Sequence, residues 1–319
     1  MNITVIGSGR WGSFLTWYLN RMGHRVTLYG RPDSPHMAAF SQTRTNGVVT
    51  LPPSVALCYD LLEAVGRADI LVISIGSQNL RSLLEQISLL APQNMDVVLC
   101  MKGLEMGTGK RLSEIAREYL PPSCPISVWL GPGHVQEFTA GIPNCMVIDS
   151  LDEAAKDRLI QAFKGDLIRF YYGQDLLGNE IGAAAKNVIG IAAGMLDGLD
   201  RTNLKGALMS RGTREIARLI AAMGGNEQSA YGLCHLGDYQ ATVFSPFSHN
   251  RRYGEAVIRH ETFDKLAEGC YTVKALLDLG NRYDVELPIC ATVDAVLYHG
   301  AHPMEALDAL FTRSLKKEF

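Results

Sequence analysis

Short apolar runs alternate with amphipathic stretches over the first half of the chain. The first run, N-I-T-V-I, covers residues 2–6 and leads directly into a glycine-rich turn. Comparable runs occur at residues 25–29, 69–75, 96–101, 126–130, 144–148 and 167–172. Segments with helical spacing of apolar residues lie among them, at 79–90, 110–119 and 151–163. This alternation predicts an α/β domain with a parallel sheet and helices on both faces.

The pattern changes near residue 175, where the β-branched runs end and helical spacing takes over. Apolar positions with a helical period occur at residues 178–197, 204–223, 263–283, 288–298 and 303–316. A chain of 319 residues is also long enough for two domains. We therefore predict an α/β domain over residues 1–175 and an all-helical domain over residues 176–319.

One polar stretch interrupts the helical half. Residues 237–254, G-D-Y-Q-A-T-V-F-S-P-F-S-H-N-R-R-Y-G, are rich in turn-forming residues, and we expect a loop. Loops longer than about a dozen residues in a compact domain are usually functional or disordered. Disorder is the alternative, although four aromatic residues favour packing. Side chains suited to an anion are Asp238, Thr242, Ser248, His249, Asn250, Arg251 and Arg252.

Nucleotide binding is the first chemistry that the sequence indicates. The motif G-S-G-R-W-G at residues 7–12 lies between the first strand and the first helix, and a second strand follows at the expected distance. In this context Gly7 permits the tight turn, Gly9 lets a pyrophosphate approach the backbone, and Gly12 lets the helix pack closely on the strand. We predict a dinucleotide-binding, Rossmann-like domain, and a purely structural glycine turn is the alternative.

The end of the second strand bears on which dinucleotide binds. NAD-specific enzymes usually carry an acidic residue there, whereas this chain has Tyr29, Gly30 and Arg31. An arginine accommodates the 2'-phosphate of NADP. We therefore expect NADP or NAD as the cofactor, with NADPH favoured, and the nearby Asp33 keeps NADH in consideration.

A lysine in an apolar helix is the main candidate for catalysis. Lys186 lies in the segment 178–198, and its neighbours three and four positions away are alanine, glycine and isoleucine. A helix that is apolar all round is normally buried, so we expect Lys186 to be desolvated. Desolvation favours the neutral amine of a lysine and suits it to proton transfer. The alternative is a surface lysine whose methylenes cover apolar neighbours.

Two strand ends in the first domain carry further candidates. Lys102 follows the strand predicted at 96–101, and the sequence G-P-G-H beginning at Gly131 follows the strand at 126–130. Ligands of open α/β sheets bind beyond the carboxyl ends of the strands. We therefore expect Lys102 and Gly131 to border a ligand, and the alternative for Lys102 is an ordinary charged residue at a strand exit.

Composition and charge exclude several classes of protein. A net charge of −3 gives no basic footprint for nucleic acid or an anionic membrane. The seven cysteines contain no CxxC pair, so we expect reduced thiols and no metal site. The first residues lack a basic, apolar leader, and no apolar run is long enough to cross a membrane. We expect a cytoplasmic protein.

Several motifs occur in a fixed order along essentially the whole chain. They are G-S-G-R-W-G at 7–12, K-G-L-E at 102–105, G-P at 131–132, E-I-G-A-A-A-K-N-V-I-G-I-A-A-G at 180–194, R-G-T-R-E-I-A-R-L at 211–219, G-D at 237–238, S-x-N-R-R-x-G at 248–254, E-G at 268–269 and E-L-P-I at 286–289. In these motifs the chain resembles the NAD(P)-dependent sn-glycerol-3-phosphate dehydrogenases of the bacterial type.

The resemblance implies a fold, an activity and a cellular setting. The fold would pair a Rossmann-like domain with a helical C-terminal domain like that of 6-phosphogluconate dehydrogenase. The activity would interconvert sn-glycerol 3-phosphate and dihydroxyacetone phosphate with NAD(P)H, in support of glycerophospholipid synthesis. The protein would be a cytoplasmic homodimer that acts on a phosphorylated small molecule.

The resemblance also implies roles for individual residues. Lys186 would be the proton donor, with Lys102, Asp238, Asn187 and Thr242 completing the catalytic group. The substrate would be held by Lys102, Gly131, Asp238, Ser248, His249 and Asn250. The cofactor would be lined by Gly7, Gly9, Arg10, Trp11, Gly12, Arg31, Lys102, Val135, His249, Leu266 and Glu268.

Three departures from the family pattern bear on the substrate. His249 stands where the family usually has a phosphate-binding arginine, Gly133 and Val135 stand where it usually has serine and alanine, and the segment from Asn250 to Glu268 is shorter than expected. A neutral imidazole holds phosphate less well than a guanidinium. Arg251 and Arg252 are candidates to compensate. The alternatives are a dehydrogenase of a different small hydroxy acid or polyol derivative, and a dinucleotide-sensing protein without catalysis.

Overall fold

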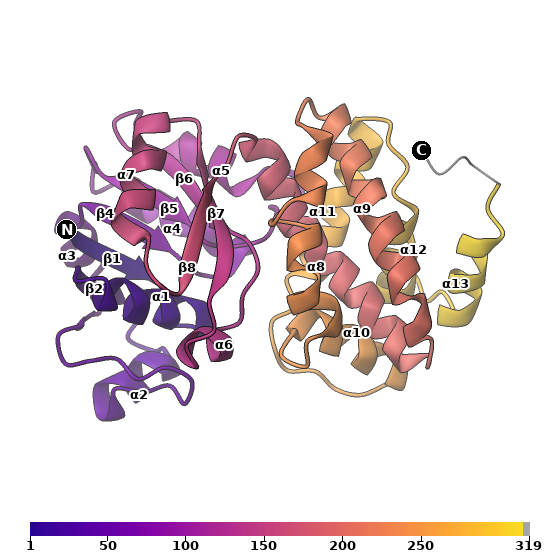
Figure 1. Ribbon diagram of the computed structural model, residues 1–319, viewed down its shortest axis with the longest axis horizontal. Helices are drawn as coiled ribbons and strands as arrows, with labels where there is room; N and C mark the ends of the chain where they lie inside the picture. Colours follow the sequence, from indigo (N-terminus) through magenta and orange to yellow (C-terminus); the bar gives the residue numbers. More distant parts are fainter. Residues whose placement is uncertain (315–319) are drawn as a thin grey trace. The chain divides into compact units, whose positions relative to one another are not determined.

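The computed structural model describes residues 1–314, and these residues fall into two compact units. One unit contains residues 1–102 and 110–180, and we call it the sheet unit. The other contains residues 103–109 and the chain from Ile181 onward, and we call it the helical unit. Figure 1 shows the strands in the first and only helices and connecting segments in the second.

The sheet unit contains an eight-stranded sheet in the order β3-β2-β1-β4-β5-β6-β7-β8. The strands are β1 Asn2–Ile6, β2 Arg25–Tyr29, β3 Ala56–Cys58, β4 Ile70–Ile73, β5 Asp96–Leu99, β6 Ile126–Leu130, β7 Asn144–Ser150 and β8 Ile168–Tyr172. Because β1 pairs with both β2 and β4, the chain reverses its direction of winding at β1. Ligands of such sheets bind at this switch point, and the predicted glycine turn directly follows β1.

The predicted parallel sheet contains one antiparallel pair. Strands β6 and β7 are antiparallel, whereas every other neighbouring pair is parallel. The connection between them contains only the short helix α6 (Val135–Thr139), so the chain turns back beside β6 instead of crossing over through a full-length helix. Strand β3 was not predicted, because three residues are too few to show a period.

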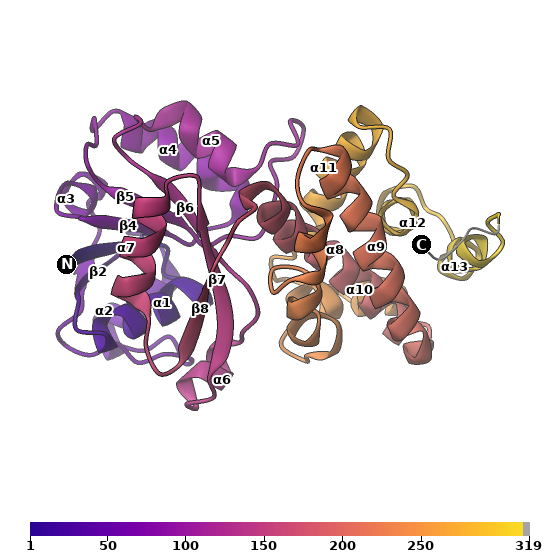
Figure 2. The same cartoon turned by 45° about the horizontal axis from the view of Figure 1, so that its top comes forward.

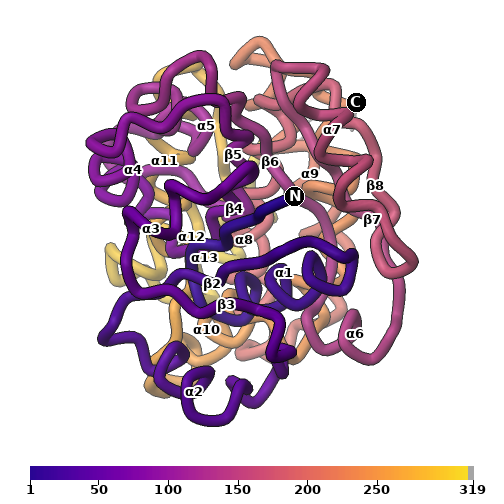
Figure 3. The backbone as a smooth tube through the Cα atoms, turned by 90° about the vertical axis from the view of Figure 1, so that its left-hand side faces the viewer, coloured from indigo at the N-terminus to yellow at the C-terminus, as the bar shows by residue number. Residues whose placement is uncertain are grey.

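Helices cover both faces of the sheet, as predicted. Helix α1 (Arg10–Arg21) lies on the same face as α7 (Glu153–Phe163), and the hydroxyl of Tyr18 donates to the carbonyl of Phe163 at 2.6 Å. The opposite face carries α3 (Leu61–Gly66), α4 (Leu80–Ser88) and α5 (Leu112–Tyr119), and α4 packs against α5 (Figures 2 and 3). Helix α2 (Pro35–Thr43) follows β2, and the 3-10 helix η1 (Ser77–Asn79) precedes α4.

The helical unit is organised around α8 (Leu176–Gly198), whose residues from Ile181 onward belong to it. The other α-helices are α9 (Lys205–Ala222), α10 (His249–Arg259), α11 (Gly269–Arg282), α12 (Pro288–Tyr298) and α13 (Pro303–Phe311). Between α9 and α10 lie the short 3-10 helices η3 (Glu227–Tyr231) and η4 (Leu236–Asp238) and a π-helical turn, η5 (Gln240–Phe244). Another 3-10 turn, η2 (Thr202–Leu204), precedes α9.

The expected loop at 237–254 is wrong in its second part. Helix α10 begins at His249, and the hydroxyl of Ser248 caps it by accepting the backbone N–H of Arg251 at 3.3 Å. The polar composition concealed this helix, since Gly254 and Ala256 are its only buried residues. Further along the chain, α11 begins six residues later than predicted, at Gly269, and α13 ends at Phe311. The last two residues of the prediction for 303–316 lie outside the described residues.

Close packing against α8 explains why α10 forms here. A Cβ atom on Gly254 would lie 2.0 Å from the carbonyl oxygen of Ile191, and one on Gly194 would lie 1.8 Å from that of Arg251. Neither position can carry a side chain without separating the two helices. Glycine on both helices therefore brings the backbone of α10 against α8 and fixes the residues at its N-terminus.

No helix within residues 1–314 combines the length and the hydropathy that crossing a membrane requires.

Candidate active site

Lys186 is buried in the middle of α8, as its apolar neighbours predicted. The residue is 9% exposed, and its Nζ donates to the hydroxyl oxygen of Thr242 at 2.8 Å. The same Nζ lies 3.2 Å from a carboxylate oxygen of Asp238. A buried ammonium is strongly destabilising unless an anion and hydrogen-bond acceptors compensate for the lost water. Asp238 and Thr242 provide both.

The two partners of Lys186 come from consecutive short helices. Asp238 ends η4, and Thr242 lies in the π-helical turn that follows. The hydroxyl of Thr242 donates to the backbone carbonyl of Asp238 at 2.8 Å, so its oxygen is directed as an acceptor toward Lys186. Single π-helical turns are rare and occur often at functional sites. Here the turn aligns a hydroxyl and a carboxylate on the same ammonium.

A pair of asparagines extends the cluster beside Lys186. The side-chain amide of Asn250 donates to the side-chain oxygen of Asn187 at 3.0 Å and accepts the backbone N–H of Gly269, also at 3.0 Å. These bonds connect α8, α10 and the N-terminus of α11. Asn250 therefore has a structural role in addition to the substrate contact predicted for it.

The structure contradicts the expectation that Arg251 compensates for the missing phosphate-binding arginine. Its guanidinium donates to Asp197 at 2.6 Å, to Glu255 at 3.2 Å and to the carbonyl of Ser245 at 3.1 Å. These contacts hold Arg251 in a network that also includes the buried Lys205, 2.7 Å from Asp197. A charge-assisted network of this kind is costly to break for an occasional ligand contact.

The neighbours of Arg251 differ from it in their contacts. Arg252 is exposed, with its guanidinium 5.8 Å from the ring centroid of Phe263. His249 packs edge-on to the same ring, and its Nδ1 lies 3.3 Å from the carbonyl of Leu266. Ser248 is buried and caps α10, so its hydroxyl oxygen already accepts one hydrogen bond.

The glycine turn of the sheet unit has the geometry that a pyrophosphate requires. Gly7 has a φ of +114°, and a Cβ atom on Gly12 would lie 1.9 Å from the carbonyl oxygen of Gly7. Gly9 is the N-cap of α1 without a side-chain cap, and a Cβ atom there would meet only open space. The first turn of α1 contains no acidic residue. Backbone N–H groups at an uncapped helix N-terminus attract an anion, so these residues fit the diphosphate of a dinucleotide.

Side chains around the turn are placed differently from one another. Arg10 donates to the side chain of Gln136 at 3.1 Å, and burial lowers the pKa of its guanidinium. The ring of Trp11 packs against those of Phe14 and Phe138. Arg31 is exposed and lies 3.5 Å from Asp33, so two neighbouring residues of opposite charge meet at the end of β2.

The strand-end residues Lys102 and Gly131 contact each other. The ammonium of Lys102, which follows β5, donates to the carbonyl oxygen of Gly131, which follows β6, at 2.6 Å. Gly131 has a φ of +121° and lies close to the backbone of Met146. The carboxyl ends of two adjacent parallel strands thus carry one hydrogen-bonded pair at the edge where ligands bind.

The remaining residues predicted to line the cofactor differ in their burial and in their place in the fold. Val135 is 3% exposed and belongs to the core of the sheet unit. Leu266 is exposed, and Glu268 is the N-cap of α11 without a side-chain cap. Within the helical unit, Lys186 meets Asp238 and Thr242, and Asn187 meets Asn250.

Sequence reasoning missed two buried polar residues near Lys186. His235 and Tyr239 are both 0% exposed, and their side chains are hydrogen-bonded at 2.7 Å. The only signal was the position of His235 within C-H-L-G-D, three residues before Asp238. In the chain as far as residue 314, no group of three or more histidine, cysteine, aspartate or glutamate side chains is arranged to hold a metal ion.

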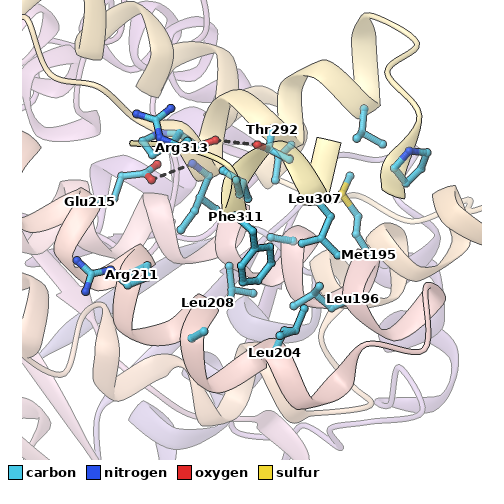
Figure 4. Close-up of a pocket in the computed structure, with 18 of the residues that line it drawn as sticks. Met195, Leu196, Leu204, Leu208, Arg211, Glu215, Thr292, Leu307, Phe311 and Arg313 are labelled. Carbon is cyan, nitrogen blue, oxygen red and sulfur yellow. Dashed lines mark hydrogen bonds between the residues drawn. The ribbon is translucent and has the colours of Figure 1, made fainter. Parts of the chain in front are cut away.

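The helical unit also contains a cavity of about 610 Å³ that is separate from this cluster (Figure 4). Its wall is mostly apolar and comes from α8, α9, α12 and α13, with Arg211, Glu215 and Arg313 among the few charged residues. None of the predicted site residues lines it. The cavity is large, but the chemistry is concentrated around Lys186 instead.

Comparison with known proteins places this geometry in a family. The models of the N-terminal and C-terminal parts of NAD-dependent glycerol-3-phosphate dehydrogenase match residues 2–156 and 175–308. A glycerol-3-phosphate dehydrogenase (NAD(P)+) of a Thermoanaerobacter species is 36% identical over 329 aligned residues, covering 100% of this chain and 99% of the relative. The chain belongs to the NAD-dependent glycerol-3-phosphate dehydrogenase family.

Other members of the family agree over the same length. A glycerol-3-phosphate dehydrogenase (NAD(P)+) from Fusobacterium nucleatum is also 36% identical, with 100% of this chain and 98% of the relative aligned. The crystal structure of glycerol-3-phosphate dehydrogenase from Coxiella burnetii superimposes with a TM-score of 0.91 at 26% identity, covering 98% of this chain and 99% of that one. The predicted fold class, a Rossmann-like domain with a helical C-terminal domain, is therefore confirmed.

Proposed function

We propose that this chain is an oxidoreductase that interconverts sn-glycerol 3-phosphate and dihydroxyacetone phosphate with NAD(P)H. Membership of the family supports the reaction type, and the observation that carries the assignment is the buried Lys186 held by Asp238 and Thr242. A buried, compensated ammonium is the group that reduction of a ketone needs, because the developing alkoxide requires a positive charge and a proton.

In the proposed mechanism the protein supplies the proton and the orientation. A bound nicotinamide provides the two-electron redox chemistry at C2. Lys186 donates a proton from Nζ to the ketone oxygen and receives one from the alcohol in the opposite direction. Asp238 and Thr242 restrict the rotation of the ammonium and stabilise its charge out of water. Asn187 contributes a neutral amide beside it and adds no charge to the site.

Residues of the sheet unit are proposed to hold the dinucleotide. The backbone from Gly7 to Gly12 fits the diphosphate, and Arg10, Trp11 and Val135 remain proposed cofactor contacts, as do Leu266 and Glu268 of the helical unit. Arg31 favours NADPH through the 2'-phosphate, although its contact with Asp33 partly offsets this charge. Lys102 is proposed to contact both substrate and cofactor, since it is held at the edge of the sheet by Gly131.

Phosphate recognition is the part of this site that departs most from the family pattern. Ser248, His249 and Asn250, with Lys102 and Gly131, are the proposed substrate contacts. Arg251 is engaged with Asp197 and Glu255. The next positively charged residue along the chain is Arg252, which lies outside that network. This observation favours, as a second candidate, a dehydrogenase of another small hydroxy acid or polyol derivative. A dinucleotide sensor without catalysis is disfavoured by the intact cluster around Lys186.

The cellular setting is proposed from the same family relationship. We place the enzyme in the cytoplasm, as a homodimer that serves glycerophospholipid synthesis. We further propose that residues 1–175 and 176–319 are its nucleotide-binding and catalytic domains.

One substrate panel tests the proposed function. Initial rates are measured with NADPH and with NADH against dihydroxyacetone phosphate, unphosphorylated dihydroxyacetone and a set of small 2-keto acids. The proposal expects kcat/KM for dihydroxyacetone phosphate to exceed that for dihydroxyacetone by at least about 100-fold, because a bound phosphate contributes several charge-assisted hydrogen bonds. Better turnover of a non-phosphorylated ketone would support the second candidate, and no turnover with tight cofactor binding would support the sensor.

A further inference from the structure

A buried histidine connects the backbone that carries Lys186 to the turn that carries its partners. His235 lies with Nδ1 2.8 Å from the carbonyl oxygen of Gly182 on α8 and with Nε2 2.7 Å from the hydroxyl of Tyr239. Burial lowers the pKa of His235 to about 4, so the imidazole is neutral near pH 7. Since the carbonyl can only accept, Nδ1 carries the hydrogen and Tyr239 donates to Nε2.

The carbonyl that His235 contacts belongs to the helical turn of Lys186. In an α-helix the carbonyl of residue 182 faces the backbone N–H of residue 186, four positions later. A Cβ atom on Gly182 would lie 3.0 Å from the Cβ of His235, tighter than most such contacts, so glycine allows the imidazole to come this close. The ring therefore contacts the backbone of α8 one turn before the Lys186 side chain emerges.

The other end of His235 is bonded into the turn that carries Asp238 and Thr242. The backbone N–H of Asp238 donates to the carbonyl of His235 at 3.0 Å, and that of Thr242 donates to the carbonyl of Tyr239 at 3.0 Å. Tyr239 immediately follows Asp238 and is 0% exposed. Its hydroxyl is bonded to the same imidazole, which holds both ends of this short segment.

We propose that His235 is a positioning residue for proton transfer: its neutral imidazole, with Tyr239, sets the distance between the Lys186 turn of α8 and the η4–η5 turn. This inference rests on the proposed function, since Lys186 must be the proton donor for its position to affect turnover. His235 has no role assigned by the motifs of the family. Proton transfer and charge stabilisation require that donor and acceptor atoms stay within a few tenths of an ångström of their productive positions. Residues beside the reacting groups provide that precision.

A simpler account makes His235 and Tyr239 only a buried polar pair that stabilises the core. The two accounts predict different turnover for variants that keep or lose the hydrogen bonds of residue 235. An asparagine at position 235 retains a donor on the atom bonded to Cγ, where Nδ1 lies in histidine, but it cannot reach Tyr239. An alanine retains neither bond. A role in stability alone predicts that turnover per folded molecule stays normal in both variants.

The test compares His235→Ala, His235→Asn and Tyr239→Phe with Leu276→Ala, which opens a cavity at a fully buried position of α11. For each full-length variant, kcat, KM for ketone and cofactor, the solvent deuterium isotope effect on kcat and the melting temperature are measured. We expect kcat of His235→Ala to fall about 10- to 100-fold, with KM for the cofactor within about twofold and an increased isotope effect. His235→Asn should recover part of kcat, and Leu276→Ala should lose thermal stability with kcat within about twofold.

Amide hydrogen exchange provides a readout that does not depend on turnover. Peptides covering residues 181–190 should exchange faster in His235→Ala than in Leu276→Ala, because the contact on Gly182 is lost only in the first. Equal kcat for His235→Ala and wild type, or equal exchange in the two alanine variants, overturns the proposal. If His235→Ala does not fold, a normal kcat and isotope effect in His235→Asn and Tyr239→Phe overturn it instead. A wild-type enzyme inactive on every ketone contradicts the proposed function, and the exchange comparison still decides whether His235 holds α8.

Discussion

At the scale of single residues, the site depends on how a positive charge is kept out of water. Lys186 is almost fully buried, and Asp238 is 1% exposed, 3.2 Å away. Two buried charges of this kind roughly cancel the cost of each other's desolvation, but either one alone is strongly destabilising. The pair is therefore maintained as a unit, and its stability and its catalytic role can be separated by experiment.

Removing one charge should cost more stability than removing both. We expect Asp238→Asn to lower the free energy of unfolding by roughly 3–5 kcal/mol, because an unpaired ammonium remains in the core. The double variant Lys186→Met with Asp238→Asn should recover most of that loss while staying inactive. Urea denaturation of the two single variants and the double variant measures the coupling. Additive losses would show that the two side chains do not interact in solution.

The neutral state of His235 gives the protein a specific response to acid. Burial lowers its pKa from 6.5 to about 4, with Asp238 acting in the opposite sense and Lys186 in the same sense. The unfolded chain then binds more protons than the folded chain between pH 4 and 6.5. The stability contributed by the neutral imidazole is therefore complete above pH 6.5 and is lost as the pH falls toward 4.

A comparison with His235→Asn isolates this contribution. Burial raises the pKa of Glu180 and Glu215, so their contributions change with pH in the opposite sense, but they are common to both proteins. We expect the stability of wild type relative to His235→Asn to fall by about 3 kcal/mol from pH 7 to pH 4, at roughly 1.4 kcal/mol per pKa unit. Denaturation at a series of pH values provides the measurement, and a difference independent of pH would mean that His235 titrates normally.

At the scale of elements, the site is assembled by the close approach of two helices. Helix α8 carries Lys186 and Asn187, and α10 carries Asn250, whose amide connects α8 to α11. Glycines at the crossing allow backbone contact between α8 and α10. The crossing of α8 and α10 therefore positions Asn187 and Asn250 relative to each other. A residue larger than glycine at the crossing should displace both.

Gly194→Ala tests this crossing against a matched glycine. The new Cβ would lie 1.8 Å from the carbonyl oxygen of Arg251, so α10 must move. We expect the free energy of unfolding to fall by roughly 2 kcal/mol or more and KM for the substrate to rise. Gly206→Ala on α9 meets open space and should leave stability unchanged or raise it by up to about 1 kcal/mol. Thermal denaturation and steady-state kinetics of both variants give the comparison. Equal behaviour of the two variants would show that α10 does not pack on α8 through glycine.

At the scale of the whole molecule, the sequence predicted the architecture better than the site. Strands β1 and β6 appear at their predicted bounds because a strand buried in a parallel sheet is apolar almost throughout, which leaves a clear signal. Lys186 was found because a charge in an apolar helix is conspicuous. Contacts between residues distant in sequence determine the antiparallel pairing of β7, the formation of α10 and the role of Arg251. The local sequence pattern does not reveal such contacts.

The predicted residues of the site illustrate the same limit. The polar segment alone marked Asp238 and Thr242 as suited to an anion, and only the resemblance grouped them with Lys186, the cation at which the structure directs both. Asn250 was predicted to hold substrate, yet it also joins three helices. The residue types were informative about chemistry, but their partners are set by the fold. His235 shows this most clearly, since its neighbours in sequence gave no reason to expect a bond to α8.

The account rests on Lys186 as the proton donor, and one measurement addresses it directly. Lys186→Met removes the ammonium but keeps an apolar side chain of similar length in the buried position. With dihydroxyacetone phosphate and NADPH we expect kcat to fall by at least about 1,000-fold, while the dissociation constant of NADPH, from fluorescence titration of the folded variant, stays within about twofold. A variant that binds NADPH normally and retains more than about a tenth of the wild-type kcat would contradict the account.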